Sequence, residues 1–328
     1  MKKYKAISMF SGGLDSILST KLMLNQNIDV VALHFSNPFC FCVEGLKGVK
    51  EVTKNLEVPL KKVSVGIGYL KMLKNPKYGY GKNLNPCIDC RIFILKKAKK
   101  IAAELKADFI FTGEVLNERP MSQHRQAMEI IENETGLKNK ILRPLSAKLF
   151  HQTDIEKQGM VDRSKLLAIN GRSRKPQIAL AKKFGIEHYP SPAGGCLLTC
   201  KEYAKKLKDL FNHKKRISMK DVTLLKIGRH FRLKRNKIIV GRNEEENKQL
   251  IDIKSKSDYY FEVPHIGSPT TILTGPKTKK AIVIAAKLTA FYSDSKNINI
   301  EVNFGKEKTD KIITVVKPDL IEVNDLRI

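Results

Sequence analysis

The sequence lacks any run of eighteen apolar residues, and it has few acidic residues for its length. Without such a run we expect no membrane span. The short apolar stretch after Met1 runs into Gly12 and Gly13, which indicates a strand rather than a secretory signal.

The 33 Asp and Glu stand against 61 Lys and Arg, so the formal net charge is +28. This excess favours a polyanionic partner. The alternative is a Lys-rich surface that serves only solubility.

Several other features are also missing, and each narrows the class of protein. No strongly amphipathic basic helix with an aromatic face stands out, so nucleic acid is a better expected partner than a membrane. The chain shows no internal repeats and no low-complexity tract. At 328 residues it is long enough for two domains, each with its own core. We therefore expect a cytoplasmic protein of two domains, residues 1–200 and 201–328.

The most informative segment is Ser11-Gly12-Gly13-Leu14-Asp15-Ser16, which directly follows the apolar run of residues 6–10. A strand, a Gly-rich turn and a helix over residues 17–24 together build an anion site, because glycines let the backbone approach a phosphate and helix N-terminal amides point at it. A carboxylate at Asp15 suits a polyphosphate if a cation such as Mg²⁺ lies between them. The spacing is not that of the common P-loop. The ordinary alternative is a plain glycine turn.

The first half alternates strands with helices, as is typical of a doubly wound parallel α/β sheet. The expected strands are residues 4–10, 30–35, 60–65 and 109–112. The expected helices are residues 16–24, 45–55 and 91–106. Ligands bind such sheets at the carboxyl ends of the strands.

Three segments fall at those strand ends and are candidate nucleotide contacts. They are the loop at Ser11, the pair His34-Phe35, and Thr112-Gly113. We expect His34 and Phe35 to lie close to an adenine or ribose. For His34, a hydrogen-bonded core histidine is the competing interpretation.

The six cysteines form three pairs in the sequence. A chain without a secretory signal keeps its thiols reduced, so pairs indicate metal or sulfur chemistry before disulfides. Cys87 and Cys90 form a C-x-x-C at the start of a helix, where the N-terminal field is expected to lower their pKa values. Cys196 follows Gly194-Gly195, a segment suited to delivering a sulfur. Cys40, Cys42 and Cys200 are as well explained by burial as by chemistry.

After residue 199 the pattern changes to short β-rich runs and one helix, typical of a small α+β domain. The expected strands are residues 237–240, 259–263, 271–273, 298–302 and 312–316, with a helix over 279–291. Between Lys201 and Lys237 there are fourteen Lys or Arg against three acids. Arginines suit phosphate oxygens and aromatics suit stacked bases. We expect this domain to bind RNA, with Arg229, Arg232 and Arg242 as phosphate contacts.

The loop at residues 11–16 resembles the S-G-G-x-D-S signature of the PP-loop ATP pyrophosphatases, of the adenine nucleotide alpha hydrolase-like fold. Residues 1–200 resemble the tRNA thiouridylases of that group. Asn85-Pro86-Cys87-Ile88-Asp89-Cys90 is similar to their N-P-C-x-x-C segment, and Gly194-Gly195-Cys196 to their Gly-x-Cys segment. Thr112-Gly113-Glu114 and Ser122-Gln123 look more like segments of the 4-thiouridine synthetases. The chain departs from both subfamilies, so the target base stays open.

The tail resembles another module, the RNA-binding domain of the fibronectin-binding-protein-like (NFACT) ribosome-associated proteins. The similarity runs through residues 237–247, Gly267-Ser268-Pro269, and the segment from Ala285-Ala286 to Tyr292-Ser293. This resemblance implies an RNA partner for the basic domain.

These resemblances imply an ATP-dependent tRNA thiolase. ATP and Mg²⁺ would bind at Ser11, Gly12, Gly13, Asp15 and Ser16, with Asp15, Cys87 and Cys196 catalytic. Two sulfur routes stay open: a persulfide on Cys196 resolved by Cys87, or a [4Fe–4S] cluster on Cys87, Cys90 and Cys196 with one open iron. The second cysteine of the C-x-x-C favours the cluster. The sulfur donor is expected to be sulfide or a cysteine desulfurase relay, and both a monomer and a homodimer stay open.

Two other classes of function compete with this one. A PP-loop ligase or amidotransferase acting on a small molecule would leave the basic tail and the C-x-x-C unexplained. A non-catalytic RNA- or ribosome-binding factor would leave the intact loop at residues 11–16 unexplained.

Overall fold

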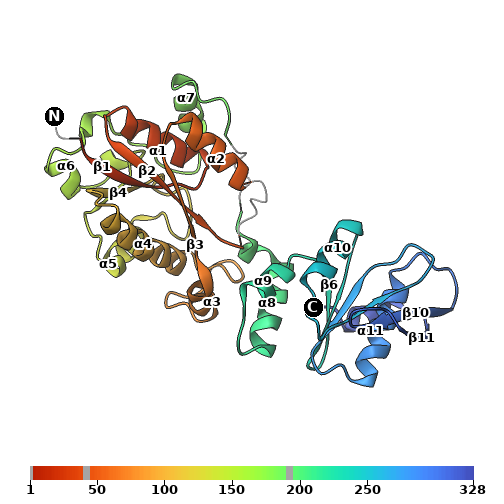
Figure 1. Cartoon of the computed structure of the whole chain (residues 1–328). Helices are drawn as coiled ribbons and strands as arrows, with labels where there is room; N and C mark the ends of the chain where they lie inside the picture. The colour runs from red at the N-terminus through yellow and green to blue at the C-terminus, as the bar shows by residue number, and fades with distance from the viewer. Residues whose placement is uncertain (1–2, 40–44, 190–194) are drawn as a thin grey trace. The chain divides into compact units, whose positions relative to one another are not determined.

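The computed structural model describes residues 3–39, 45–189 and 195–328. They form two compact units, Met1–Thr199 and Cys200–Ile328 (Figure 1). Each unit has its own sheet and its own buried core. Within the described ranges, no helix has both the length and the apolar character needed to span a bilayer.

The first unit is built on a parallel sheet of five strands in the order β3-β2-β1-β4-β5. The strands are β1 (Lys5–Met9), β2 (Asp29–Ser36), β3 (Leu60–Ser64), β4 (Phe109–Thr112) and β5 (Ile141–Leu142). Met9, the last residue of β1, pairs with Leu33 of β2 on one side and with Thr112 of β4 on the other. The carboxyl ends of these three strands therefore lie together at one edge, as the predicted doubly wound sheet requires.

Helices cover both faces of this sheet. They are α1 (Leu14–Leu24), α2 (Gly45–Asn55), α3 (Gly66–Lys74), α4 (Cys87–Glu104), α5 (Arg125–Thr135), α6 (Asp154–Lys157) and α7 (Lys175–Lys183). Three short 3₁₀ turns lie at Ala147–Leu149, Arg163–Lys165 and Leu197–Thr199. The predicted helices at 16–24 and 91–106 begin earlier than expected, at Leu14 and Cys87, so the C-x-x-C lies inside its helix.

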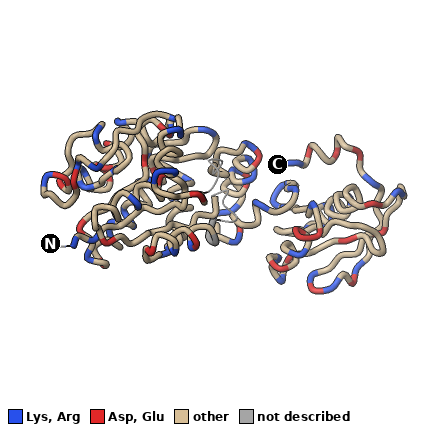
Figure 2. Tube along the Cα trace, turned by 90° about the horizontal axis from the view of Figure 1, so that it is seen from above, with Lys and Arg blue, Asp and Glu red and all other residues tan. Residues whose placement is uncertain are grey.

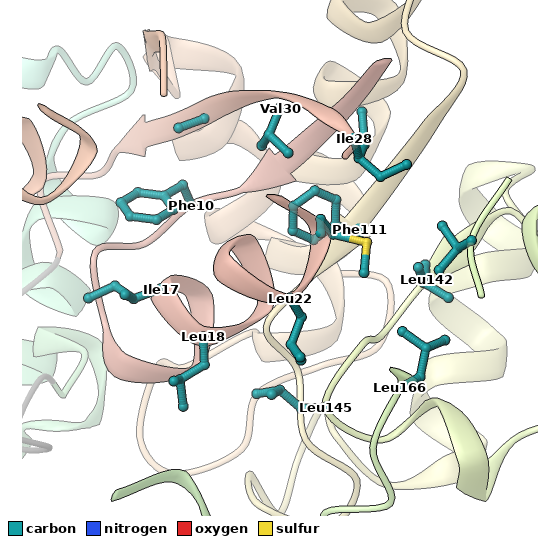
Figure 3. Packing of buried hydrophobic residues seen from close by; sticks show 14 of the residues in the cluster. Phe10, Ile17, Leu18, Leu22, Ile28, Val30, Phe111, Leu142, Leu145 and Leu166 are labelled. Atoms are coloured by element: carbon teal, nitrogen blue, oxygen red, sulfur yellow. The ribbon is translucent and has the colours of Figure 1, made fainter. Parts of the chain in front are cut away.

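The two faces of the sheet bury different hydrophobic clusters, because successive strand residues point to opposite sides. Ala6 and Val30 pack with α1 in one cluster, together with Phe10, Ile17 and Leu18 (Figure 3). On the other face, Ile7 and Leu33 pack with residues of α4 and α5. Burial on both faces explains why these strands are nearly continuous apolar runs in the sequence.

The second unit is an α+β fold with an antiparallel six-stranded sheet in the order β11-β10-β8-β9-β7-β6. The strands are β6 (Arg229–Leu233), β7 (Asn236–Val240), β8 (Tyr259–Glu262), β9 (Thr271–Thr274), β10 (Asn299–Gly305) and β11 (Lys311–Val316). The helices are α8 (Lys201–His213), α9 (Met219–Leu224), α10 (Glu244–Ile253), α11 (Lys279–Phe291) and α12 (Leu320–Asp325). Buried residues of α11 pack against one face of the sheet, and Leu250 of α10 packs against the other.

Candidate active site

The loop between β1 and α1 is held in shape by its own side chains. The Ser16 hydroxyl donates to the Gly13 carbonyl (2.8 Å) and accepts from the Gly12 N–H (3.2 Å). The Gly13 N–H donates to the Ser11 hydroxyl (3.2 Å). Gly12 has a φ of +84°, which favours glycine, and a Cβ there would also meet Val49. The loop is thus preformed, with α1 starting directly after Gly13.

Asp15 occupies the first turn of α1, next to the loop. Its Oδ1 is buried and has no hydrogen-bond partner among the described residues. Burial raises the pKa of this carboxyl, although the Arg174 guanidinium lowers it. An orphaned, buried carboxylate oxygen fits a bound cation, because a cation supplies the missing partner.

His34 and Phe35 lie at the end of β2 but point to opposite faces of the sheet. The His34 Nδ1 lies 3.0 Å from the Phe10 carbonyl oxygen, and burial lowers the pKa of this imidazole. Phe35 packs with the cluster on the α4 side. Only His34 therefore shares the face of α1, and a contact of either residue with a nucleotide stays a prediction.

The Thr112-Gly113-Glu114 segment touches both the loop helix and the C-x-x-C helix. A Cβ on Gly113 would lie only 2.6 Å from the Asp15 carbonyl carbon and from the Ser16 nitrogen, so only glycine fits here. The next residue, Glu114, is buried and forms ion pairs with Arg91 (3.3 Å) and Arg143 (3.2 Å). These two pairs hold the pKa of Glu114 below its usual value, against the effect of burial.

Cys87 and Cys90 lie in the first turn of α4, which Asp89 fastens to the preceding segment. The Asp89 carboxylate accepts from the backbone N–H groups of Lys77 (2.8 Å) and Tyr78 (3.0 Å). The Tyr69 hydroxyl donates to the Cys90 sulfur (3.2 Å). The thiols are therefore half-buried side chains fixed within a packed helix start.

The expected lowering of the thiol pKa values is wrong. Burial raises the pKa of both Cys87 and Cys90. The Arg91 guanidinium lowers both, and Arg119 lowers that of Cys87, but desolvation is the larger effect. The helix-start argument failed because it took the thiols to be exposed, whereas α3 and Tyr69 cover this turn.

Cys196 comes close to the C-x-x-C through backbone contacts of the two residues that follow it. The Leu197 N–H donates to the Phe39 carbonyl (2.8 Å), and the Leu84 N–H donates to the Leu198 carbonyl (3.0 Å). The pKa of Tyr69 is raised well above its usual value, first by burial and then by the thiols of Cys90 and Cys196. Cys90 therefore contacts this phenol, and Cys196 lies near enough to affect its charge.

Cys87, Cys90 and Cys196 have the chemistry of iron–sulfur cluster ligands, but in this structure they are not arranged around one metal position. Within residues 3–39, 45–189 and 195–328, no three His, Cys, Asp or Glu side chains are positioned to hold one metal ion. Cys200 belongs to the second unit, where its thiol donates to Glu202 (3.0 Å). Cys40, Cys42 and Gly194 lie outside the described residues.

The arginines expected to contact phosphates in the second unit are engaged within it. Arg232 holds the Asp209 carboxylate (Nε to Oδ1, 2.8 Å), and Arg242 pairs with Glu246. Arg229 lies over the Tyr292 ring, 4.4 Å from its centroid, and donates to the Gly241 carbonyl. Lys and Arg are nonetheless spread along both units, as Figure 2 shows. Arg229 and Arg232 are half-buried, whereas Arg242 is exposed and remains a candidate for RNA contact together with other exposed basic side chains.

Sequence reasoning missed two residues that face the loop, Arg174 and Gln177. The Arg174 Nη2 lies 3.9 Å from the Asp15 Oδ2, and α7 packs against α1. The one local signal for Arg174 is its place beside the basic residues Arg172 and Lys175. The one local signal for Gln177 is a glutamine at an inward-facing position of a helix.

Comparison with known families finds one match within each unit. Residues 2–158 match the family described as thiamine biosynthesis protein (ThiI), and residues 228–324 match the NFACT protein RNA binding domain. The parallel sheet and the loop at residues 11–16 give the first unit an α/β fold of the PP-loop type. Each match covers less than half of the chain and says what that part of it is similar to.

Curated relatives match part of the chain. A tRNA-specific 2-thiouridylase MnmA of Pseudoalteromonas atlantica is 29% identical over 136 residues, covering 38% of this chain and 34% of its own length. A probable tRNA sulfurtransferase of Finegoldia magna is 30% identical over 145 residues, covering 44% of this chain and 36% of its own length. The chain therefore spans about a third of the length of these relatives. A solved 4-thiouridine synthetase–RNA complex with bound ATP is 20% identical, with a TM-score of 0.41, covering 68% of this chain and 52% of that one.

Proposed function

We propose that this chain is an ATP-dependent tRNA thiolase, which adenylates a uridine carbonyl and replaces its oxygen with sulfur. The observation that carries the proposal is one sheet edge at which a preformed phosphate loop, a partnerless Asp15 oxygen and a thiol-bearing helix are connected through residues 112–114. The names of the partial relatives, a 2-thiouridylase and a sulfurtransferase, support the same reaction class.

The activation step follows from the chemistry of the base. The uridine oxygen is a poor leaving group, so it first attacks the α-phosphorus of ATP, and pyrophosphate leaves. The backbone amides of Gly12 and Gly13 and the hydroxyls of Ser11 and Ser16 would hold the phosphates. Asp15 would hold Mg²⁺, which supplies charge neutralisation when bound.

The first of the two sulfur routes uses thiols alone. The terminal sulfur of a Cys196 persulfide attacks the activated carbon, and AMP leaves. The Cys87 thiolate then attacks the Cys196 sulfur, which breaks the S–S bond and releases the thiocarbonyl with its electron pair. A Cys87–Cys196 disulfide results, so an external dithiol must reduce it and a sulfur donor must reload Cys196.

Activity is tested by incubating the protein with ATP, tRNA and a sulfur donor. We expect RNA-dependent formation of AMP and pyrophosphate, together with a thiolated nucleoside in the digested tRNA. Asp15→Ala should abolish both products, whereas Asp29→Ala, at the opposite end of the sheet, should leave them unchanged. Formation of ADP would overturn the proposal.

Iron content separates the two sulfur routes. If a [4Fe–4S] cluster carries the sulfur, the anaerobically purified protein is brown, and single Ala variants of Cys87, Cys90 and Cys196 each lose iron and activity. If the persulfide route holds, the protein contains no iron and Cys90→Ala retains activity. Cys200→Ala serves as the matched control and should remain active.

A further inference from the structure

The start of α7 presents polar side chains to the phosphate loop from a distant part of the sequence. Arg174 is the N-cap residue of α7, and Gln177 lies in its first turn. Ala181, one turn further on, is buried in the cluster that also contains residues of α1. The spacing of three and four residues places Arg174, Gln177 and Ala181 on one face of the helix. Packing of that face against α1 fixes Arg174 and Gln177 beside Asp15.

Four buried polar atoms at this junction have no hydrogen-bond partner among the described residues: Asp15 Oδ1, Arg174 Nε, Gln177 Nε2 and Gln177 Oε1. Gln177 is 0% exposed. Its amide helps to lower the pKa of Asp15, but no hydrogen bond between them has normal geometry. The Arg174–Asp15 ion pair is long, at 3.9 Å. Buried polar groups are normally satisfied, so a cluster of unsatisfied ones marks a site that awaits a ligand.

The mixture of groups identifies the chemical class of that ligand. A cation alone would satisfy Asp15 but would leave the Arg174 guanidinium and the Gln177 N–H groups without acceptors. An anion alone would suit Arg174 but would be repelled by Asp15. A metal-bound polyphosphate satisfies all three side chains at once, because its oxygens accept hydrogen bonds and its metal binds the carboxylate.

We infer that Arg174 and Gln177 bind the β- and γ-phosphates of Mg²⁺-bound ATP, and that Arg174 exchanges its long ion pair with Asp15 for phosphate oxygens when the nucleotide enters. This inference rests on the proposed function, since it names further residues of the same ATP site. The guanidinium fork suits phosphate oxygens better than a single lysine ammonium does. The exposed Arg172, two residues upstream, has no place in the site.

The test compares binding of Mg²⁺-ATP, magnesium pyrophosphate and AMP by calorimetry. Loss of one charge-assisted contact should raise the Kd of Arg174→Ala for Mg²⁺-ATP and magnesium pyrophosphate about 10-fold or more. Its Kd for AMP should stay within about twofold, since AMP lacks both contacted phosphates. Arg172→Ala is the matched control and should bind all three as the unaltered protein does.

A second variant gives a readout that a purely structural role would not produce. Gln177→Met removes two unsatisfied buried groups at similar volume, so it should raise the Tm of the ligand-free protein. The same variant should reduce the further Tm increase caused by Mg²⁺-ATP. If the ligand-free Gln177→Met protein has a lower Tm than the unaltered protein, the inference is overturned, because the amide would then have a structural partner.

The outcomes separate this inference from the proposed function. If the unaltered protein does not bind Mg²⁺-ATP, the proposed function fails and the inference fails with it. If the unaltered protein binds Mg²⁺-ATP and Arg174→Ala binds it equally well, only the inference is overturned. Equal weakening of ATP and AMP binding would also overturn it, because Arg174 would then act through the nucleoside part or the fold.

Discussion

The carboxylate beside the loop of the first unit is held differently from two carboxylates of the second unit. In the first unit, Asp15, Arg174 and Gln177 keep buried atoms without partners next to the phosphate loop. In the second unit, Asp209 is held by Arg232 and Lys237, and Glu246 by Arg242. Single unsatisfied atoms also occur in the second unit, at His230 and Thr271, so it is the cluster of such atoms around Asp15 that indicates ligand chemistry. A count of basic residues does not indicate it, because several of them already hold the fold.

The largest effect is expected from Gly113→Ala in the first unit. A Cβ would approach the Asp15–Ser16 peptide to 2.6 Å, so α1 must shift. We expect the free energy of unfolding to fall by about 1–3 kcal/mol and Mg²⁺-ATP binding to be lost. Denaturant unfolding and calorimetry measure the two effects. Gly48→Ala is the control, because a Cβ there meets nothing within 4 Å; an equally small effect of both variants would contradict the prediction.

In the second unit, Arg232→Ala should lower stability, because Arg232 holds a buried carboxylate. It removes the bidentate partner of Asp209, a side chain only 9% exposed. Breaking such a pair should lower the free energy of unfolding by about 3 kcal/mol. Hydrogen exchange in β6 and β7 would report the loss, with the exposed Arg235→Ala as control. Unchanged stability with weaker RNA binding would show that Arg232 is a phosphate contact after all.

A smaller effect is expected from Lys215 and Arg216, which are exposed just after α8. They replace Arg229 and Arg232 as our candidates for RNA contact. Each lost phosphate contact should reduce the log–log slope of tRNA affinity against salt by about 0.7–0.9. Binding titrations of Lys215→Ala and Arg216→Ala at several salt concentrations measure this. ATP affinity should not change; an unaltered salt slope would exclude this segment from the RNA surface.

The smallest effect is a pH dependence in the second unit. Burial lowers the pKa values of Lys206 and Lys237 to about 8. Between that pH and the unfolded value of 10.5, the unfolded chain binds more protons than the folded one, so stability should rise with pH. Lys237→Met should flatten the rise in unfolding titrations, whereas the exposed Lys234→Met should not. A fall in stability over this range would contradict the assignment.

The sequence predicted those parts of the fold that depend on local patterns. The apolar run before Ser11 and the glycines after it predicted β1, the loop and α1, and the strand at residues 109–112 has the predicted bounds. The two-residue β5 was missed because so short a strand has no periodicity. Contacts such as Arg174 with Asp15, between residues far apart in the chain, leave no local signal. The thiol pKa values were mispredicted because burial by α3 and Tyr69 depends on tertiary packing.

Gly113 and Glu114 are consecutive residues with different neighbours. The first lies against the peptide between Asp15 and Ser16, and the second holds Arg91, whose charge lowers the pKa of both thiols of the C-x-x-C. A rigid, planar peptide bond joins them. Two adjacent residues thus join the loop at residues 11–16 to the helix that carries Cys87 and Cys90.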